Sequence, residues 1–207
     1  MIRFAARVFT AVVMLSVLAV VSADAHHVMG GKLPATFGQG LLSGLGHPVI
    51  GIDHLAFIVA VGVAVGIAGL NLAIPAVFVV ASALGVAAHV RGVTVPGVEL
   101  MVAASVVLAG ALLAWGGMAR SKVWGWVALF AVAGLFHGYA YGESIFGAEP
   151  TPLTAYLLGL VAVQTALATG VALLMRRHST AVFNARLTGA VIAGIGLATL
   201  AGQIVPA

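Results

Sequence analysis

The densest group of side chains that could bind a metal ion lies at residues 47–54, which read His-Pro-Val-Ile-Gly-Ile-Asp-His. Imidazole nitrogens combined with a carboxylate oxygen suit nickel, cobalt, zinc or copper(II). Asp53 and His54 lie in a long apolar run, and a charge inside a bilayer costs about 2.5–3.5 kcal/mol on insertion scales. Such residues usually face an interior cavity and mark an ion pathway. The segment therefore predicts a metal site within a membrane span, with a structural Asp–His pair between helices as the alternative.

Pro48 and Gly51 determine how these ligands could meet. Proline lacks an amide hydrogen and suits the first turn of a helix, so we expect His47 at the cap and Asp53 and His54 further in. In one unbroken helix, His47 and His54 would lie about 10 Å apart along the axis. One ion could bind both only if the backbone from Pro48 to Gly51 is irregular, and glycine permits such an opening.

A second polar group lies at residues 137–144, His-Gly-Tyr-Ala-Tyr-Gly-Glu-Ser. His137 and Tyr141 are four residues apart and would share one face of a helix. Glu143 follows at the expected membrane edge. An interfacial aromatic belt would also account for the tyrosines. His137 lies deeper in the apolar run, and we predict that it is a ligand or a relay residue.

Other polar residues have competing interpretations. Glu99 begins an apolar run, where a carboxylate is costly without a partner. It is either part of the ion pathway or the partner of Arg91 or His89. Gln164 lies inside a later run and is predicted to form a hydrogen bond between helices, and His178 is predicted to be a solvated loop residue.

The N-terminus is typical of a secretory signal. Two arginines precede an uncharged core at 8–21, and Ala-Asp-Ala at 23–25 is an A-x-A cleavage site. Cleavage would place His26 and His27 at the start of the mature chain. The α-amine and imidazole of His26 would then form a chelate of the kind that nickel(II) and copper(II) favour. The alternatives are an uncleaved first span and a polar N-terminus without a metal role.

Composition indicates that these residues belong to a membrane protein. Hydrophobic residues make up 62% of the 207 positions and charged residues 7%, against about 25% charged in soluble domains. The mean hydropathy is +1.20. The net charge of +4 does not indicate nucleic-acid binding, because the basic residues flank apolar runs as topology signals do. The chain has no cysteine, which excludes disulfides, thiolate metal sites and a cysteine nucleophile.

Apolar runs long enough to cross a bilayer define the predicted fold. There are six of them: 48–69, 71–90, 97–118, 123–142, 152–175 and 186–205. Residues 38–47 are expected to form a short extra helix or a re-entrant piece before the first span. The predicted fold class is an all-α integral membrane protein. It consists of a cleaved signal peptide at 1–25 and one domain at 26–207, a bundle of six transmembrane helices.

Charge predicts the orientation of this bundle in a bacterial inner membrane. With the mature N-terminus outside, the inner loops hold five basic residues and the outer segments hold Lys32 and Arg91. This distribution agrees with the positive-inside rule and places both mature termini outside. The five inner residues are Arg120, Lys122, Arg176, Arg177 and Arg186.

The two polar motifs resemble those of a known family. The pattern His-Pro-x-x-Gly-x-Asp-His at 47–54 is similar to the signature of the HupE/UreJ nickel permeases, and residues 136–143 resemble their second motif. The signal peptide, the histidines after it and six spans also match, so the resemblance covers essentially the whole chain. It departs at Tyr141, where many members have a further histidine. The resemblance implies uptake of nickel(II), sometimes cobalt(II), for hydrogenase or urease assembly.

The predicted function is therefore transport, with the ion as cargo and no prosthetic group or catalytic residue. His26 and His27 are predicted to collect the ion outside, and His47, Asp53 and His54 to form the central site. His137, with Glu99 or Glu143 nearby, is predicted to complete that site or to pass the ion on. The alternatives are a permease for copper or zinc, an intramembrane metal-dependent hydrolase and a metal sensor. The chain lacks the H-E-x-x-H motif that would favour a hydrolase. The expected partners are the ion and the lipid bilayer, and the sequence leaves homo-oligomerisation open.

Overall fold

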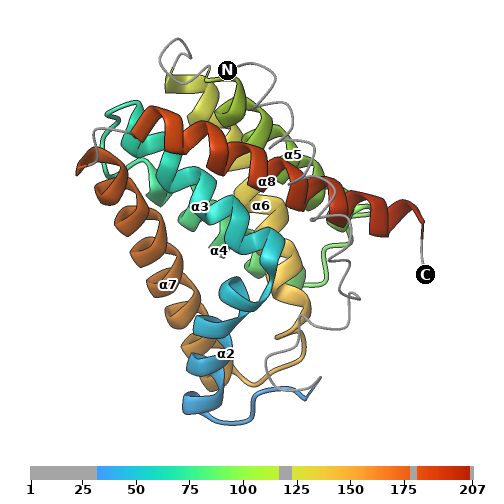
Figure 1. Ribbon diagram of the computed structural model, residues 1–207. Helices are drawn as coiled ribbons and strands as arrows, with labels where there is room; N and C mark the ends of the chain where they lie inside the picture. Colours follow the sequence, from blue (N-terminus) through green and yellow to red (C-terminus); the bar gives the residue numbers. More distant parts are fainter. Residues whose placement is uncertain (1–31, 117–122, 178–180, 206–207) are drawn as a thin grey trace.

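The computed structural model describes residues 32–116, 123–177 and 181–205, and every regular element in this part is a helix (Figure 1). The predicted signal peptide, His26, His27 and His178 lie outside the described residues. The helices are α2 (Phe37–Ile50), α3 (Ile52–Ile67), α4 (Pro75–Val90), α5 (Val98–Trp115), α6 (Val123–Glu143), α7 (Pro150–Arg177) and α8 (Ala181–Ile204).

The described helices give four or five candidate membrane spans. By length and composition, α5, α6, α7 and α8 could each cross a bilayer, and α2 with α3 forms one further broken span that bends by 78°. α4 has 16 residues, a rise of about 24 Å against about 30 Å of hydrocarbon. The all-helical membrane class is confirmed, whereas length and composition support fewer than the six spans that the sequence predicts.

Pro48 does not begin the first span, contrary to the sequence prediction. Thr36 caps α2, because its side chain accepts a hydrogen bond from the backbone N–H of Gln39. The helix then continues to Ile50, so Pro48 lies in its last turn. Proline has no N–H to bond the carbonyl of Gly44, four residues earlier, and α2 ends two residues later at Ile50. The expected extra helix at 38–47 is present and is longer than predicted.

Gly51 separates α2 from α3. Its backbone is extended, with φ −69° and ψ 100°, and α3 begins at the next residue. The irregular backbone that joint binding by His47 and His54 would require is therefore present at Gly51, in the form of a sharp bend. Figure 1 shows α2 turning away from the axis of α3 along the lower part of α7.

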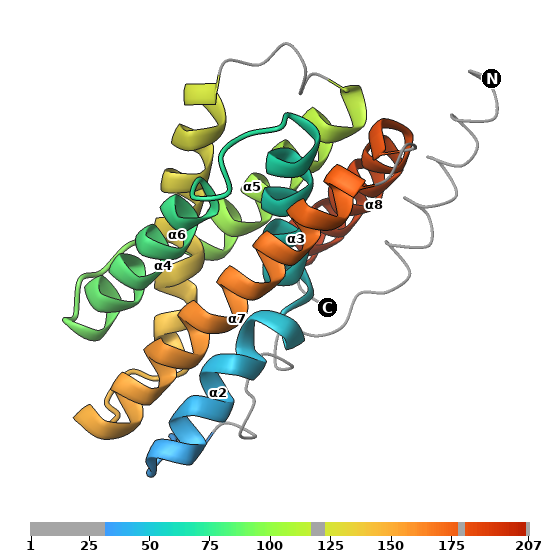
Figure 2. The ribbon, with the colours of Figure 1, turned by 90° about the vertical axis from the view of Figure 1, so that its left-hand side faces the viewer.

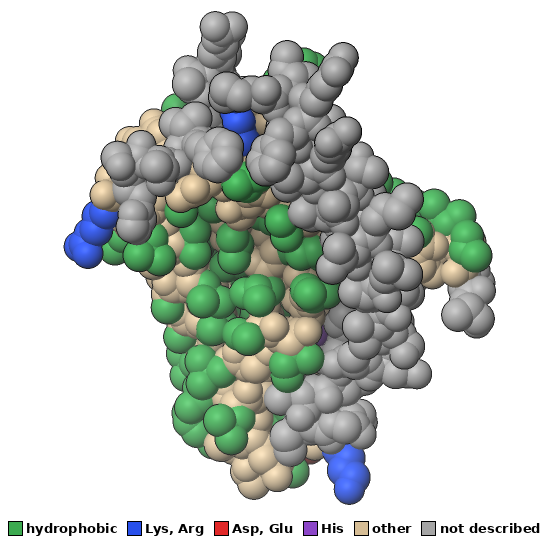
Figure 3. Space-filling view, in the orientation of Figure 1, with side chains coloured by type: hydrophobic (Ala, Val, Ile, Leu, Met, Phe, Trp, Pro, Cys, Tyr) green, Lys and Arg blue, Asp and Glu red, His purple; other side chains and the backbone are tan. Residues whose placement is uncertain are grey.

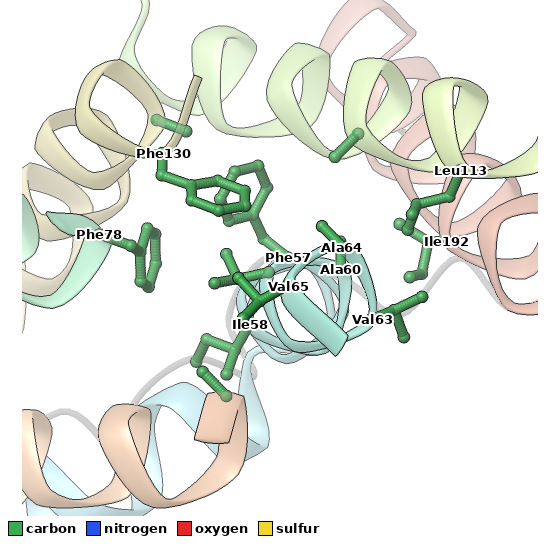
Figure 4. Packing of buried hydrophobic residues seen from close by; sticks show 14 of the residues in the cluster. Phe57, Ile58, Ala60, Val63, Ala64, Val65, Phe78, Leu113, Phe130 and Ile192 are labelled. Atoms are coloured by element: carbon green, nitrogen blue, oxygen red, sulfur yellow. The ribbon is translucent and has the colours of Figure 1, made fainter. Parts of the chain in front are cut away.

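The helix α3 lies at the centre of the bundle and contacts every other described helix. Most of its side chains are buried on all sides, as expected of a helix that is apolar all round. Figure 4 shows Phe78, Phe130, Leu113 and Ile192, from four different helices, around Phe57 and its neighbours on α3. The central position of α3 places its first turn, with Asp53 and His54, in the interior.

Glycines allow the backbones of paired helices to touch. A Cβ on Gly44 of α2 would lie 2.0 Å from the carbonyl oxygen of Tyr156 on α7. A Cβ on Gly138 of α6 would lie 1.9 Å from the carbonyl oxygen of Ser82 on α4. Figure 2 shows both pairs side by side, α2 along α7 and α4 beside α6. Small residues at such contacts are typical of helix packing in membranes.

The outer surface suits a lipid environment. Figure 3 shows apolar side chains over much of the visible face, with Lys and Arg side chains toward its upper and lower ends. Trp115 and Trp124, at the end of α5 and the start of α6, are 86% and 78% exposed. Exposed tryptophans of this kind are common at the bilayer interface. We conclude that the protein is a multi-pass membrane protein with the bilayer as a partner.

Candidate metal centre

His47 lies in the last turn of α2 and is buried. Its Nδ1 lies 3.0 Å from the Ser144 hydroxyl oxygen and 3.0 Å from the Tyr156 hydroxyl oxygen. Ser144 directly follows α6, and Tyr156 belongs to α7. Two hydroxyl groups that are 97 and 109 positions away in the sequence therefore fix the orientation of this imidazole.

The bend at Gly51 brings His54 to His47. The ring centroids of the two histidines lie 5.9 Å apart, with the rings inclined by 75°. An unbroken helix would have separated them by about 10 Å along its axis. Gly51 also leaves room for the His54 ring, since a Cβ at position 51 would lie 2.7 Å from His54 Cδ2. The sharp bend and the missing side chain together allow the two imidazoles to meet.

Asp53 and His54 form the first turn of α3, and both are buried. The Asp53 Oδ1 accepts a hydrogen bond of 2.8 Å from the backbone N–H of His54. The carboxylate is thereby held at the N-terminus of the helix, where negative charge is favourable. It supplies the anionic group of the cluster.

His137 completes the group of buried histidines from α6. Its Nδ1 lies 2.8 Å from Nδ1 of His54, and its Nε2 lies 2.9 Å from the Ser105 hydroxyl oxygen on α5. The aromatic rings of Phe57 and Phe78 pack against it, with centroid distances of 4.7 and 5.8 Å. His137 is fully buried, and it brings α6 into contact with the cluster at the bend.

Tyr141 packs against two of these histidines. Its ring centroid lies 4.3 Å from that of His54 and 5.1 Å from that of His47. Neither the Tyr141 hydroxyl nor the nearby Gln164 Oε1 has a hydrogen-bond partner of normal geometry among the described residues. Gln164 Nε2 donates to the Ser82 hydroxyl at 3.1 Å, which confirms the predicted hydrogen bond between helices.

The remaining predicted carboxylates, Glu99 and Glu143, differ in their exposure. Glu143 ends α6 and is exposed, whereas Glu99 is half-buried in the first turn of α5. Asp53 and Glu143 are both close enough to Glu99 to act on it electrostatically. Among the described contacts, Glu99 has no ion pair or hydrogen bond with Arg91 or His89. The His89 ring instead packs against two aromatic rings, those of Tyr139 and Phe146.

The direct contact between His54 Nδ1 and His137 Nδ1 is a hydrogen bond, and the two nitrogens are too close together to bind one ion without moving apart. One Nδ1 must donate a proton to the other. Two nitrogens on one tetrahedral ion at about 2.0–2.1 Å would be about 3.3 Å apart, so an ion needs the pair to separate by about 0.5 Å. Accordingly, the described residues contain no group of three His, Cys, Asp or Glu side chains already arranged around one ion.

Sequence reasoning missed the hydroxyl groups that hold the histidines. Ser105, Ser144 and Tyr156 each lie in or beside an apolar run, and that polarity is their only signal in the sequence. Their contacts with His137 and His47 join residues 32 to 109 positions apart. Local spacing cannot reveal such contacts, because they depend on how the helices pack.

The fold and the cluster define a class: a multi-pass helical membrane protein that buries three histidines and an aspartate at a broken helix. The chain belongs to the HupE/UreJ family, since the model of the family described as HupE / UreJ protein matches residues 12–199. A relative, Protein HupE of Rhizobium leguminosarum bv. viciae, is 32% identical over 170 residues, which cover 79% of this chain and 86% of that protein. No solved structure matches the chain. The predicted family resemblance is thus confirmed.

Proposed function

We propose that this protein carries nickel(II) inward across the bacterial inner membrane. The observation that carries the proposal is the meeting of three buried imidazoles where α6 packs against the bend between α2 and α3, with the buried Asp53 carboxylate bonded to the backbone of one of them, His54. Nitrogen and oxygen donors of this kind suit nickel and its neighbours in the transition series. The family is linked to accessory roles for hydrogenase and urease, which supports supply of the ion to such an enzyme.

The residues also suggest an order of transfer. His26 and His27 would collect the ion outside the membrane. Glu143 is exposed and Glu99 is half-buried, and the electrostatic influence of both Glu143 and Asp53 on Glu99 supports a route through these carboxylates. The ion would then reach Asp53 and the buried histidines.

The membrane potential is sufficient to drive such uptake. Each elementary charge gains about 2.3 kcal/mol in a potential of about 100 mV, so a dication gains about 4.6 kcal/mol. This energy corresponds to accumulation of more than about a thousandfold. No ATPase is required for transport on this scale.

Cobalt(II) is the closest alternative cargo, and copper or zinc could use the same donors. Copper outcompetes nickel at most nitrogen and oxygen sites, so ligand type does not separate these ions. A metal sensor or an intramembrane hydrolase is a different class of protein. Membership of the HupE/UreJ family favours a transporter over an enzyme.

Purified protein in liposomes tests the proposal. With an inside-negative potential, we expect radioactive nickel to accumulate in these liposomes and not in protein-free ones. Competition by unlabelled cobalt, copper and zinc then ranks the cargo. Binding of nickel without accumulation would favour a sensor, and preferential accumulation of another metal would overturn the choice of ion.

We expect the C-terminus to face the periplasm. Arg176 donates a hydrogen bond to the Leu70 carbonyl, and a Cβ on Gly116 would meet the Arg186 guanidinium. These contacts support one basic end of the bundle, formed by the loop after α3, the end of α5, the last turn of α7 and the first turns of α8. A reporter that is active only in the periplasm should work when fused after Ala207. Activity of a cytoplasm-only reporter there would contradict this orientation.

A further inference from the structure

The hydrogen bonds of Ser105 determine which nitrogen of His137 carries its proton. The Ser105 hydroxyl donates to the Val102 carbonyl at 2.7 Å, a common bond for serine within a helix. A hydroxyl has one proton to donate. Its oxygen can therefore only accept from the second neighbour, His137 Nε2, at 2.9 Å.

This assignment leaves the other nitrogen of His137 with a lone pair. A neutral imidazole that carries its proton on Nε2 has an unprotonated Nδ1. That Nδ1 faces His54 Nδ1 at 2.8 Å. The nitrogen that can bind an ion thus points at the cluster, and the nitrogen that cannot is turned toward α5.

The same arrangement recurs at His47. Tyr156 donates its proton to the Tyr141 carbonyl at 2.9 Å, and Ser144 donates to the same carbonyl at 3.0 Å. Both hydroxyl oxygens then accept from His47 Nδ1, each at 3.0 Å. The lone pair of His47 therefore lies on Nε2.

We propose that Ser105 is a positioning residue that holds His137 in its Nε2-protonated form and so directs Nδ1 toward the transported ion. The proposal rests on the proposed function, since it assigns the ion-binding atom of the same site. Partners of this kind behind a metal-binding histidine are typically worth about 10–100-fold in metal affinity. Ser105 has no charge, and among the described residues His137 is the one predicted ligand to which it is hydrogen-bonded, so its effect should act through that ring.

The tautomer is measured by nitrogen-15 NMR of histidine-labelled full-length protein in lipid nanodiscs without metal, with His137→Asn used to assign the signal. We expect a protonated Nε2 and an unprotonated Nδ1 in the wild type. Ser105→Ala should raise the Nδ1-protonated fraction, because it removes the acceptor for Nε2–H. Ser105→Thr should preserve the wild-type signal, because threonine can form the same bond to the helix backbone.

Nickel binding to the same samples gives the second readout. We expect Ser105→Ala to bind nickel about 10–100-fold more weakly and Ser105→Thr to bind it nearly normally. Ser43→Ala is the matched control, since Ser43 is also a buried helical serine, on α2, and no hydrogen bond joins its hydroxyl to an imidazole among the described residues. This control should leave both the tautomer and the affinity unchanged.

The outcomes separate this proposal from the proposed function. A wild-type His137 protonated on Nδ1 overturns the role of Ser105, whether or not nickel is carried. Unchanged affinity in a folded Ser105→Ala protein overturns it as well. If the tautomers follow the expectation but the wild type takes up no nickel, the assignment of Ser105 to His137 stands and the choice of cargo fails.

Discussion

Asp53→Asn protein is expected to reach the membrane in near-normal amount and to lose nickel uptake when nickel is limiting. Asparagine keeps the size of the side chain. Its Oδ1 can still accept the hydrogen bond from the His54 backbone N–H, which Asp53 Oδ1 accepts at 2.8 Å in the wild type. It removes the negative charge that offsets a dication in the interior. At about 4 Å and an effective dielectric constant of about 20, one pair of unit charges is worth about 4 kcal/mol, or roughly a thousandfold in occupancy.

The His54→Gln variant distinguishes a metal site from a purely structural pair of Asp53 and His54. Glutamine keeps a polar side chain but removes the imidazole that meets His47 and His137. If the Asp–His pair were only structural, folded protein and uptake would decline together. Immunoblots of membranes alongside radioactive nickel uptake measure the two quantities. His89→Gln serves as the control and should keep its uptake, because the His89 ring packs against aromatic residues outside the cluster. Near-normal uptake by both Asp53→Asn and His54→Gln would refute the proposed site.

The residues of the cluster could be predicted from the sequence because polar side chains within a membrane span are energetically unfavourable. Asp53, His54 and His137 interrupt apolar runs, and polar groups within a bilayer are rare unless they have a function or a partner. The spacing also indicated that His47 and His54 could bind one ion together only if the backbone between them is irregular. The structure confirms this irregularity as the bend of 78° at Gly51.

The start of the first span could not be read from its local pattern. Pro48 fits the first turn of a helix, but prolines are also tolerated inside membrane helices. The choice depends on α2, which begins at its Thr36 cap and lies against α7 through Gly44. That contact joins residues more than a hundred positions apart. The roles of Ser105 and Tyr156 were hidden for the same reason, since a hydroxyl in an apolar run does not specify its partner.

Gly138→Ala should greatly reduce the amount of folded protein. The added Cβ would lie 1.9 Å from the Ser82 carbonyl oxygen and 2.6 Å from the Ser82 Cα. Both are backbone atoms, so no side-chain rotation relieves the contact and α6 must move away from α4. Overpacking typically costs about 1–3 kcal/mol, and a clash between backbones belongs at or above the upper end of that range. Membrane abundance and thermal stability in detergent measure the loss.

Gly170→Ala on α7 is the matched control, because a Cβ there would meet no atom within 4 Å. Alanine also favours a helix over glycine by about 1 kcal/mol, so this variant should be at least as stable as the wild type. Equal stability of Gly138→Ala and Gly170→Ala would contradict the close packing of α4 on α6. Gly138 directly follows His137, and any protein that survives with α6 displaced should also bind nickel poorly. Asp53→Asn and Gly138→Ala should therefore fail in distinguishable ways: Asp53→Asn should lose uptake with its packing intact, whereas Gly138→Ala should lose stability and nickel binding together.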